Sequence, residues 1–96
     1  MAADPDAPVI MRLSPRDNIA VALRPLKAGE SIVLDGVAMT VERNTGVGQK
    51  IAAQPIAAGD LILKYSCPIG TATRAISPGE RIDKNNVETD YPPTHR

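Results

Sequence analysis

Leu26-Lys27-Ala28-Gly29-Glu30 decides the fold, because its pattern of an apolar residue, two variable residues, glycine and an acid recurs twice along the chain. The other copies are Ile56-Ala57-Ala58-Gly59-Asp60 and Ile76-Ser77-Pro78-Gly79-Glu80. Glycine suits a turn position with positive φ, and the acid begins the next extended stretch, so each copy predicts strand, turn and strand. The glycines at 29, 59 and 79 are 30 and then 20 positions apart. That spacing is too uneven for a stacked solenoid and favours one small β domain.

Asp35-Gly36 is the clearest indication of a hairpin. It lies between two runs with alternating apolar residues, 31–34 and 37–41, and Asp-Gly is typical of a two-residue type I′ turn. The register set by this turn places apolar side chains on one buried face, namely Ile32, Leu34, Val37, Met39 and Val41. Residues 44–48 are expected to form a flexible loop. Because no apolar pattern runs at helical spacing, we predict a mostly β fold of short strands and hairpins with little helix.

The composition excludes several classes of protein. At 96 residues the chain has room for one domain, and without Phe or Trp its core must be aliphatic. Eleven basic residues balance eleven acidic ones, which removes the positive field that attracts nucleic acid or an acidic membrane surface. The single cysteine, Cys67, excludes an internal disulfide and is typical of a reducing compartment. With no signal-peptide pattern in residues 1–8 and no membrane-spanning stretch, a cytoplasmic location is expected.

The two ends differ from the middle of the chain. Both are rich in proline and show no apolar period, so we expect a flexible N-terminal segment over 1–12 and a flexible C-terminal tail over 90–96. The only histidine, His95, lies in that tail and is not expected to be catalytic. The folded domain is therefore predicted to span 13–89.

Several short motifs occur in an order that resembles one known family. They are residues 15–23 (Pro-Arg-Asp-Asn-Ile-Ala-Val-Ala-Leu), 48–52 (Gly-Gln-Lys-Ile-Ala), Lys64-Tyr65, 68–73 (Pro-Ile-Gly-Thr-Ala-Thr) and the three glycine turns. Over most of residues 13–88 the chain is similar to the SAF domain of the altronate and galactarate dehydratases. The resemblance implies a β-clip fold. It also implies an N-terminal module, or a separate small subunit, beside a much larger catalytic partner that removes water from sugar acids.

The resemblance further implies where cofactors would lie. A divalent metal such as iron would belong to the catalytic partner of this carbon-oxygen lyase, and this domain would bind no cofactor itself. Where family members commonly have Gly-His-Lys, this chain has Gln49, and in place of the first three residues of a His-x-His-Asn run it has Asp83-Lys84-Asn85. Glutamine and asparagine neither titrate near neutral pH nor bind transition metals well. We therefore expect no metal ligand and no catalytic residue in the isolated chain, which would be inactive alone.

Five residues between the turns are candidates for contact with a substrate: Asp17, Asn18, Gln49, Lys50 and Asn86. Asp17 and Asn18 either present a carboxylate and an amide to a sugar acid or form a polar turn before a strand. Lys50 either contacts a substrate carboxylate as a point charge or is a solvated lysine. Asn86 either contacts substrate or belongs to a polar turn that closes the domain.

Two functions remain open from the sequence. One is an accessory SAF domain or small subunit that helps form or cover the active site of a larger sugar-acid dehydratase. The other is a stand-alone module, without catalytic activity, that binds a small anionic sugar acid or a protein partner. A complete dehydratase is disfavoured, because the chain lacks both a metal site and a general base.

Overall fold

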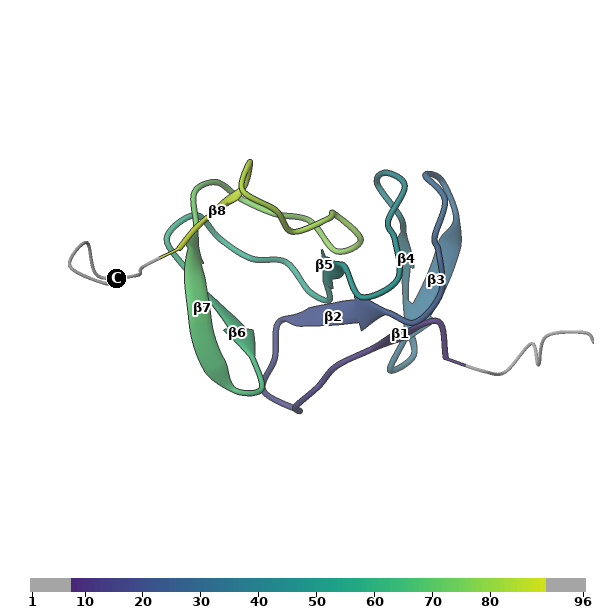
Figure 1. The fold of residues 1–96 in the computed structure, drawn as a ribbon, viewed down its shortest axis with the longest axis horizontal. Helices are drawn as coiled ribbons and strands as arrows, with labels where there is room; N and C mark the ends of the chain where they lie inside the picture. The colour runs from purple at the N-terminus through teal and green to yellow at the C-terminus, as the bar shows by residue number, and fades with distance from the viewer. Residues whose placement is uncertain (1–7, 90–96) are drawn as a thin grey trace, which may run out of the picture.

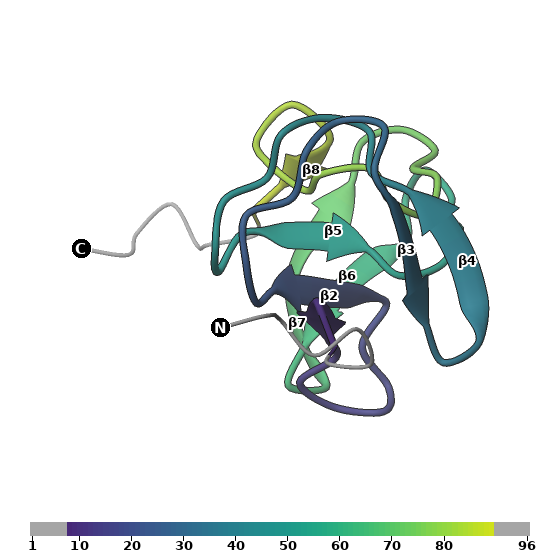
Figure 2. The ribbon, with the colours of Figure 1, turned by 90° about the vertical axis from the view of Figure 1, so that its right-hand side faces the viewer.

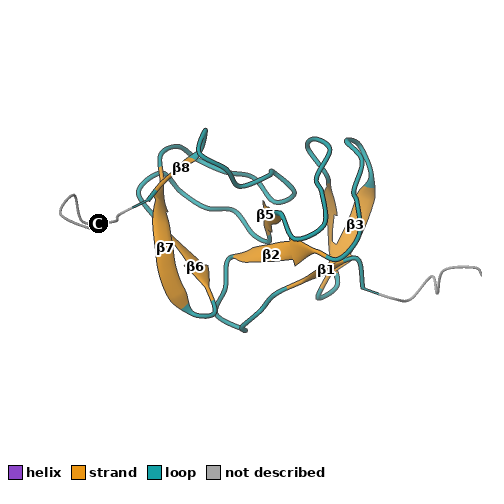
Figure 3. Ribbon diagram, viewed as in Figure 1, coloured by secondary structure: helices purple, strands orange, loops and turns teal. Residues whose placement is uncertain are grey.

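Short strands and tight turns make up the whole of the described structure. The computed structural model describes residues 8–89, in which eight strands and no helix occur (Figure 1, Figure 3). The strands are β1 (Ile10–Met11), β2 (Ile19–Ala22), β3 (Ser31–Leu34), β4 (Val37–Thr40), β5 (Lys50–Ala52), β6 (Leu61–Lys64), β7 (Cys67–Ala72) and β8 (Val87–Glu88). The prediction of a mostly β fold is confirmed. Over this range no helix could span a membrane.

The strands form three small antiparallel sheets, in the orders β1-β2-β5, β3-β4 and β6-β7-β8. The two hairpins β3–β4 and β6–β7 lie at opposite ends of the molecule, with β2 and β5 between them (Figure 1). Viewed along the long axis, β2 lies between β1 and β5 (Figure 2).

Strand β1 lies inside the stretch 1–12, where a flexible segment was expected. Ile10 pairs with Ala22 and Met11 with Val21, and the Ile10 side chain is only 1% exposed. A strand of two residues is too short to leave a recognisable sequence pattern. Because Ile10 is buried, the folded part of the chain begins before residue 13. The other predicted limits stay predictions, and the expected flexible ends at 1–7 and 90–96 lie outside the described residues.

The repeated turn occurs four times in the described residues, and the additional copy is 45–49. Residues 44–48 were expected to form a flexible loop, and this expectation was wrong, because 45–48 belong to the ordered turn. In every copy the fifth side chain accepts a hydrogen bond from the backbone N–H three residues earlier. The pairs are Glu30 with Lys27 (3.0 Å), Gln49 with Gly46 (2.8 Å), Asp60 with Ala57 (3.0 Å) and Glu80 with Ser77 (2.9 Å). The fourth residue is a glycine with φ between 82° and 90° each time. Gln49 accepts the same hydrogen bond as the three acidic residues. The turn therefore requires an acceptor oxygen at its fifth residue, but it does not require a negative charge.

The turns associate two by two. Leu26 bridges Thr45, and Ile56 bridges Ile76. Each pair encloses one hairpin, β3–β4 in the first case and β6–β7 in the second. We call residues 20–49 the first unit and 50–80 the second unit; up to the tip of each hairpin, equivalent positions differ by 30, as at Leu26 and Ile56.

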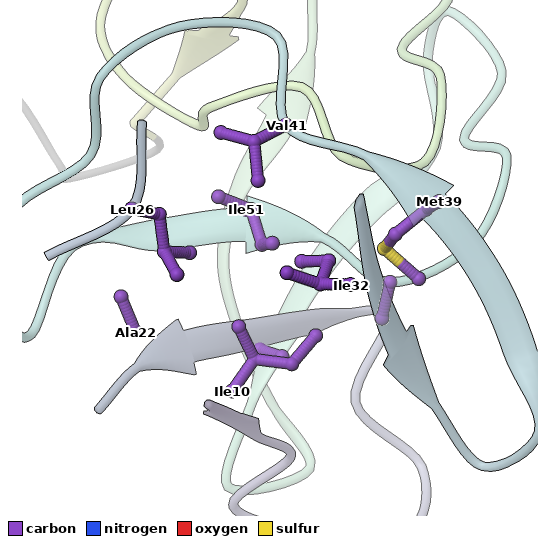
Figure 4. Close-up of a cluster of buried hydrophobic side chains, with 9 residues drawn as sticks. Ile10, Ala22, Leu26, Ile32, Met39, Val41 and Ile51 are labelled. Carbon is purple, nitrogen blue, oxygen red and sulfur yellow. The ribbon is translucent and has the colours of Figure 1, made fainter. Parts of the chain in front are cut away.

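The core consists of two hydrophobic clusters, and most residues of each cluster come from one unit. The first cluster contains Ile10, Ala20, Ala22, Leu26, Ile32, Met39, Val41, Ile51 and Ala53 (Figure 4). The second contains Ile19, Ala52, Ile56, Ile62, Ala72, Ile76 and Ile82. Burying one such isoleucine contributes about 1.5–3 kcal/mol, so aliphatic residues supply the core, as predicted.

The predicted hairpin face is buried only in part. Ile32, Met39 and Val41 are buried, and Leu34 packs at the edge of the cluster. Val37, in contrast, is 53% exposed, which corrects the prediction for this residue. The reason is geometric, because Val37 lies at the closed end of the hairpin, opposite Leu34, which is itself only partly buried.

Candidate functional site

A cleft of about 410 Å³ opens between the second unit and the chain that follows it. Its lining is Lys50, Lys64, Ile69, Ile82, Asp83, Lys84, Val87 and Thr89. Three lysines thus line the cleft together with two isoleucines and a valine, and the volume is in the range of small-molecule sites. We call this feature the lysine cleft.

Three different elements carry the lysines. Lys50 is the first residue of β5, and its backbone oxygen accepts a 2.8 Å hydrogen bond from the N–H of Ile82. Lys64 ends β6, directly opposite Cys67 in the hairpin. Lys84 lies in the loop between Ile82 and β8. The cleft therefore depends on the packing of β5 and β6 against the chain that follows the last turn.

Asp83 is the acidic residue of the lining, and it forms ion pairs with two arginines. Its carboxylate accepts a 2.8 Å hydrogen bond from the N–H of Asn85 and lies 3.0 Å from Nη2 of Arg43 and 3.5 Å from Nη2 of Arg81. Partial burial on its own would raise the pKa of Asp83, but that N–H and the two arginines together lower it below its ordinary value. With Asp83 ionised and paired to arginine, the three lysines give the cleft an excess of positive charge.

Asn86, a predicted substrate contact, is fully buried. Its Oδ1 accepts a 3.0 Å hydrogen bond from the N–H of Asp83, and its Nδ2 donates to the oxygen of Arg81 at 2.8 Å. The side chain thus closes the loop 81–86, which presents Asp83 and Lys84 to the cleft. Its proposed contact with a substrate stays a prediction.

Asp17 and Asn18 lie away from the cleft lining and bind the hairpin β6–β7. The Asp17 carboxylate accepts hydrogen bonds from the N–H groups of Tyr65 (3.0 Å) and Ser66 (2.7 Å). Asn18 donates to the oxygen of Leu61 at 2.8 Å and accepts from the N–H of Leu63 at 2.9 Å. Both side chains are engaged with backbone, so their contact with a substrate also stays a prediction.

The five predicted residues therefore do not form one site. Lys50 lines the cleft, Asn86 supports its loop, and Gln49 caps the second turn. Sequence reasoning missed Lys64 and Lys84. Aligning the two units would have pointed to Lys64, because its equivalent in the first unit is the apolar Leu34 at the end of β3.

The described residues contain no group of three or more His, Cys, Asp or Glu side chains that could hold a metal ion. The lining of the lysine cleft combines three lysines with isoleucine and valine side chains. The ammonium group of a lysine attracts a carboxylate as a point charge.

Comparison with known proteins gives a consistent result. The family described as the altronate/galactarate dehydratase SAF domain matches residues 8–90. The altronate dehydratase of Bacillus subtilis (strain 168) is 39% identical over 80 residues, which are 83% of this chain and 16% of that protein. The altronate dehydratase of Escherichia coli (strain K12) is 35% identical over 74 residues, 77% of this chain and 15% of that protein. The chain thus corresponds to a small part of each relative.

Proposed function

Because this chain belongs to the altronate/galactarate dehydratase SAF domain family, we propose that it is the accessory domain or small subunit of a sugar-acid dehydratase. In this role it helps to form or cover the active site of a larger catalytic partner. The lysine cleft is the observation that carries the proposal, because three ammonium groups around an apolar patch suit the carboxylate end of a sugar acid.

The division of labour follows from the residues present. Lys50, Lys64 and Lys84 bind and orient the carboxylate of the substrate, while the elimination of water takes place in the partner. A divalent metal such as iron, implied by the family resemblance, would belong to the partner. A cytoplasmic location remains part of this proposal.

The test uses this chain together with the dehydratase-like catalytic chain of the same organism. Dehydration of altronate and galactarate is measured with the catalytic chain alone, with added wild-type chain, and with the variant Lys50→Gln. Addition of the wild-type chain should raise activity at least about tenfold, and Lys50→Gln should raise KM, because a carboxylate contact is lost. Lys27→Gln is the matched control, since Lys27 is an exposed lysine outside the cleft lining.

Two results would contradict the proposal. One is a catalytic chain that is equally active alone and does not co-elute with this chain. The other is equal KM values for wild type, Lys50→Gln and Lys27→Gln, which would remove the lysine cleft from the binding of substrate.

A stand-alone binding module is the second candidate. The loss of the family histidines favours it, because Gln49, Asp83 and Asn85 take their places and none of these side chains titrates near neutral pH. Thermal shift of the isolated chain with aldonic and aldaric acids distinguishes the two. A shift without any partner supports the module, and its absence alongside partner-dependent activity supports the accessory subunit.

A further inference from the structure

The turn of the β6–β7 hairpin has an unusual backbone for its sequence. Tyr65 and Ser66 both have positive φ, 54° and 64°. In the first unit the equivalent turn is Asp35-Gly36, with φ of 52° and 79°, the residue types that tolerate this conformation. Tyrosine and serine adopt it only at a cost in free energy, so other contacts must hold the turn in place.

Asp17 supplies those contacts. Its side chain is 1% exposed, and its two carboxylate oxygens accept the N–H groups of Tyr65 and Ser66 separately. The hydroxyls of Ser14 and Ser66 also contact each other. Together with the two hydrogen bonds of Asn18 to β6, two neighbouring side chains make four hydrogen bonds to one hairpin. The tip is therefore rigid before any partner binds.

This rigid tip presents an apolar surface. Tyr65 is 63% exposed, and Cys67 and Pro68, which follow the turn in β7, are exposed as well. No residue from 65 to 73 carries a charge, in a chain where 23% of residues are charged. A tyrosine held in one backbone conformation loses little entropy on binding, which suits it to act as an anchor in a protein interface.

We propose that the hairpin tip, defined as Tyr65, Cys67 and Pro68, docks into an uncharged apolar pocket of the larger catalytic polypeptide. The inference rests on the proposed function, which supplies the partner. Two observations favour this occupant. The matched region is 16% and 15% of the two relatives, so a much larger body of protein accompanies this domain in both. Lys64, which precedes Tyr65, lines the lysine cleft, so docking through the tip brings the cleft to the partner's surface.

The test measures the affinity of this chain for the dehydratase-like catalytic chain of the same organism by biolayer interferometry. Tyr65→Gly is the decisive variant, because glycine tolerates positive φ and the substitution removes the side chain while preserving the turn. It should weaken binding at least about tenfold and leave the thermal midpoint equal or higher. Val33→Ala is the matched control, since Val33 is 62% exposed on the hairpin of the first unit; it should change affinity less than about twofold.

Asp17→Asn tests how the tip is held. Asparagine retains one acceptor oxygen but directs an amide towards a backbone N–H, so binding and the thermal midpoint should both fall. Equal affinity for wild type and Tyr65→Gly would overturn the docking proposal and leave the accessory function intact. Loss of binding in Val33→Ala but not in Tyr65→Gly would move the interface to the first unit and overturn it too. No binding by the wild-type chain would reject the proposed function itself.

Discussion

Gly79 lies against the backbone of Thr40, so close that a Cβ atom at position 79 would be 2.1 Å from the Thr40 oxygen. This contact joins the last turn of the second unit to the hairpin of the first, and the N–H of Glu42 donates to the Gly79 oxygen beside it at 3.1 Å. Gly79→Ala should therefore cost about 3 kcal/mol, from a left-handed backbone and from overpacking together. Urea unfolding followed by circular dichroism measures the loss.

Gly48→Ala is the internal control for that measurement. Gly48 occupies the same turn position with φ of 82°, but nothing lies within 4 Å of its Cβ direction. Only the backbone strain of about 1–2 kcal/mol should appear. Equal losses for the two variants would show that the contact between the units contributes nothing.

Asn86→Ala should destabilise the chain by about 2–4 kcal/mol, because it leaves the N–H of Asp83 and the oxygen of Arg81 without their partner. Asn85→Ala, an exposed neighbour, should change stability by less than about 0.5 kcal/mol. Thermal unfolding compares the two. An Asn86→Ala chain as stable as wild type, but with a raised KM in the assembled enzyme, would favour the substrate contact instead.

Acid should destabilise the fold through the carboxylates of the turns. The pKa of Glu30 is lowered by its hydrogen bond with Arg24, and also by the N–H of Lys27. Burial alone would raise the pKa of Glu80, yet Arg74, which lies 2.8 Å away, and the N–H of Ser77 lower it overall. A carboxylate whose pKa is lower in the folded chain stabilises the fold above its ordinary pKa, and this contribution disappears as pH falls through the lowered value.

The urea midpoint should accordingly be constant near neutral pH and decrease below the ordinary glutamate value of 4.5. The double variant Glu30→Gln/Glu80→Gln keeps acceptor oxygens, as Gln49 does in its own turn, and should show a shallower decrease. A wild-type midpoint that stays constant down to pH 3 would contradict this account.

Binding of galactarate in the lysine cleft should depend on ionic strength. The three lysines are at least partly exposed. Salt therefore weakens their attraction for an anion, with a screening length of about 10 Å at 0.1 M ionic strength. Affinity, measured by calorimetry on the assembled enzyme, should fall as sodium chloride rises from 50 to about 300 mM. The uncharged polyol galactitol should not compete. Equal competition by galactitol would mean that the lysines do not recognise a carboxylate.

The β3–β4 hairpin was predictable because its information is local. Asp35-Gly36 specifies the turn, and the alternation on either side specifies the register, with Ile32 opposite Met39 as observed. The turn at 45–49 was missed because Thr45 replaces the apolar residue and Gln49 the acid. Its structure depends on an acceptor oxygen and a glycine, which the pattern of charges and apolar residues does not reveal.

The β6–β7 hairpin and the lysine cleft depend on distant residues. Tyr65-Ser66 is not a turn sequence by its own preferences, and the carboxylate that stabilises it lies 48 and 49 positions earlier. Lys64 and Lys84 come together only when β6 and the loop before β8 are in place. The family resemblance pointed to Lys50. It could not show that the side chains of Asp17 and Asn18 are already hydrogen-bonded to backbone groups of the β6–β7 hairpin.

The first unit can be compared with the second, position by position. They share turns, hairpins and hydrogen bonds, yet Lys50 and Lys64 of the second unit occupy the places of Ala20 and Leu34 in the first. The two units thus share their turns and hairpins but differ in charge at these two positions. A double variant with the first unit's apolar residues at these positions, Lys50→Ala and Lys64→Leu, should therefore fold normally and lose two of the three positive charges of the lysine cleft.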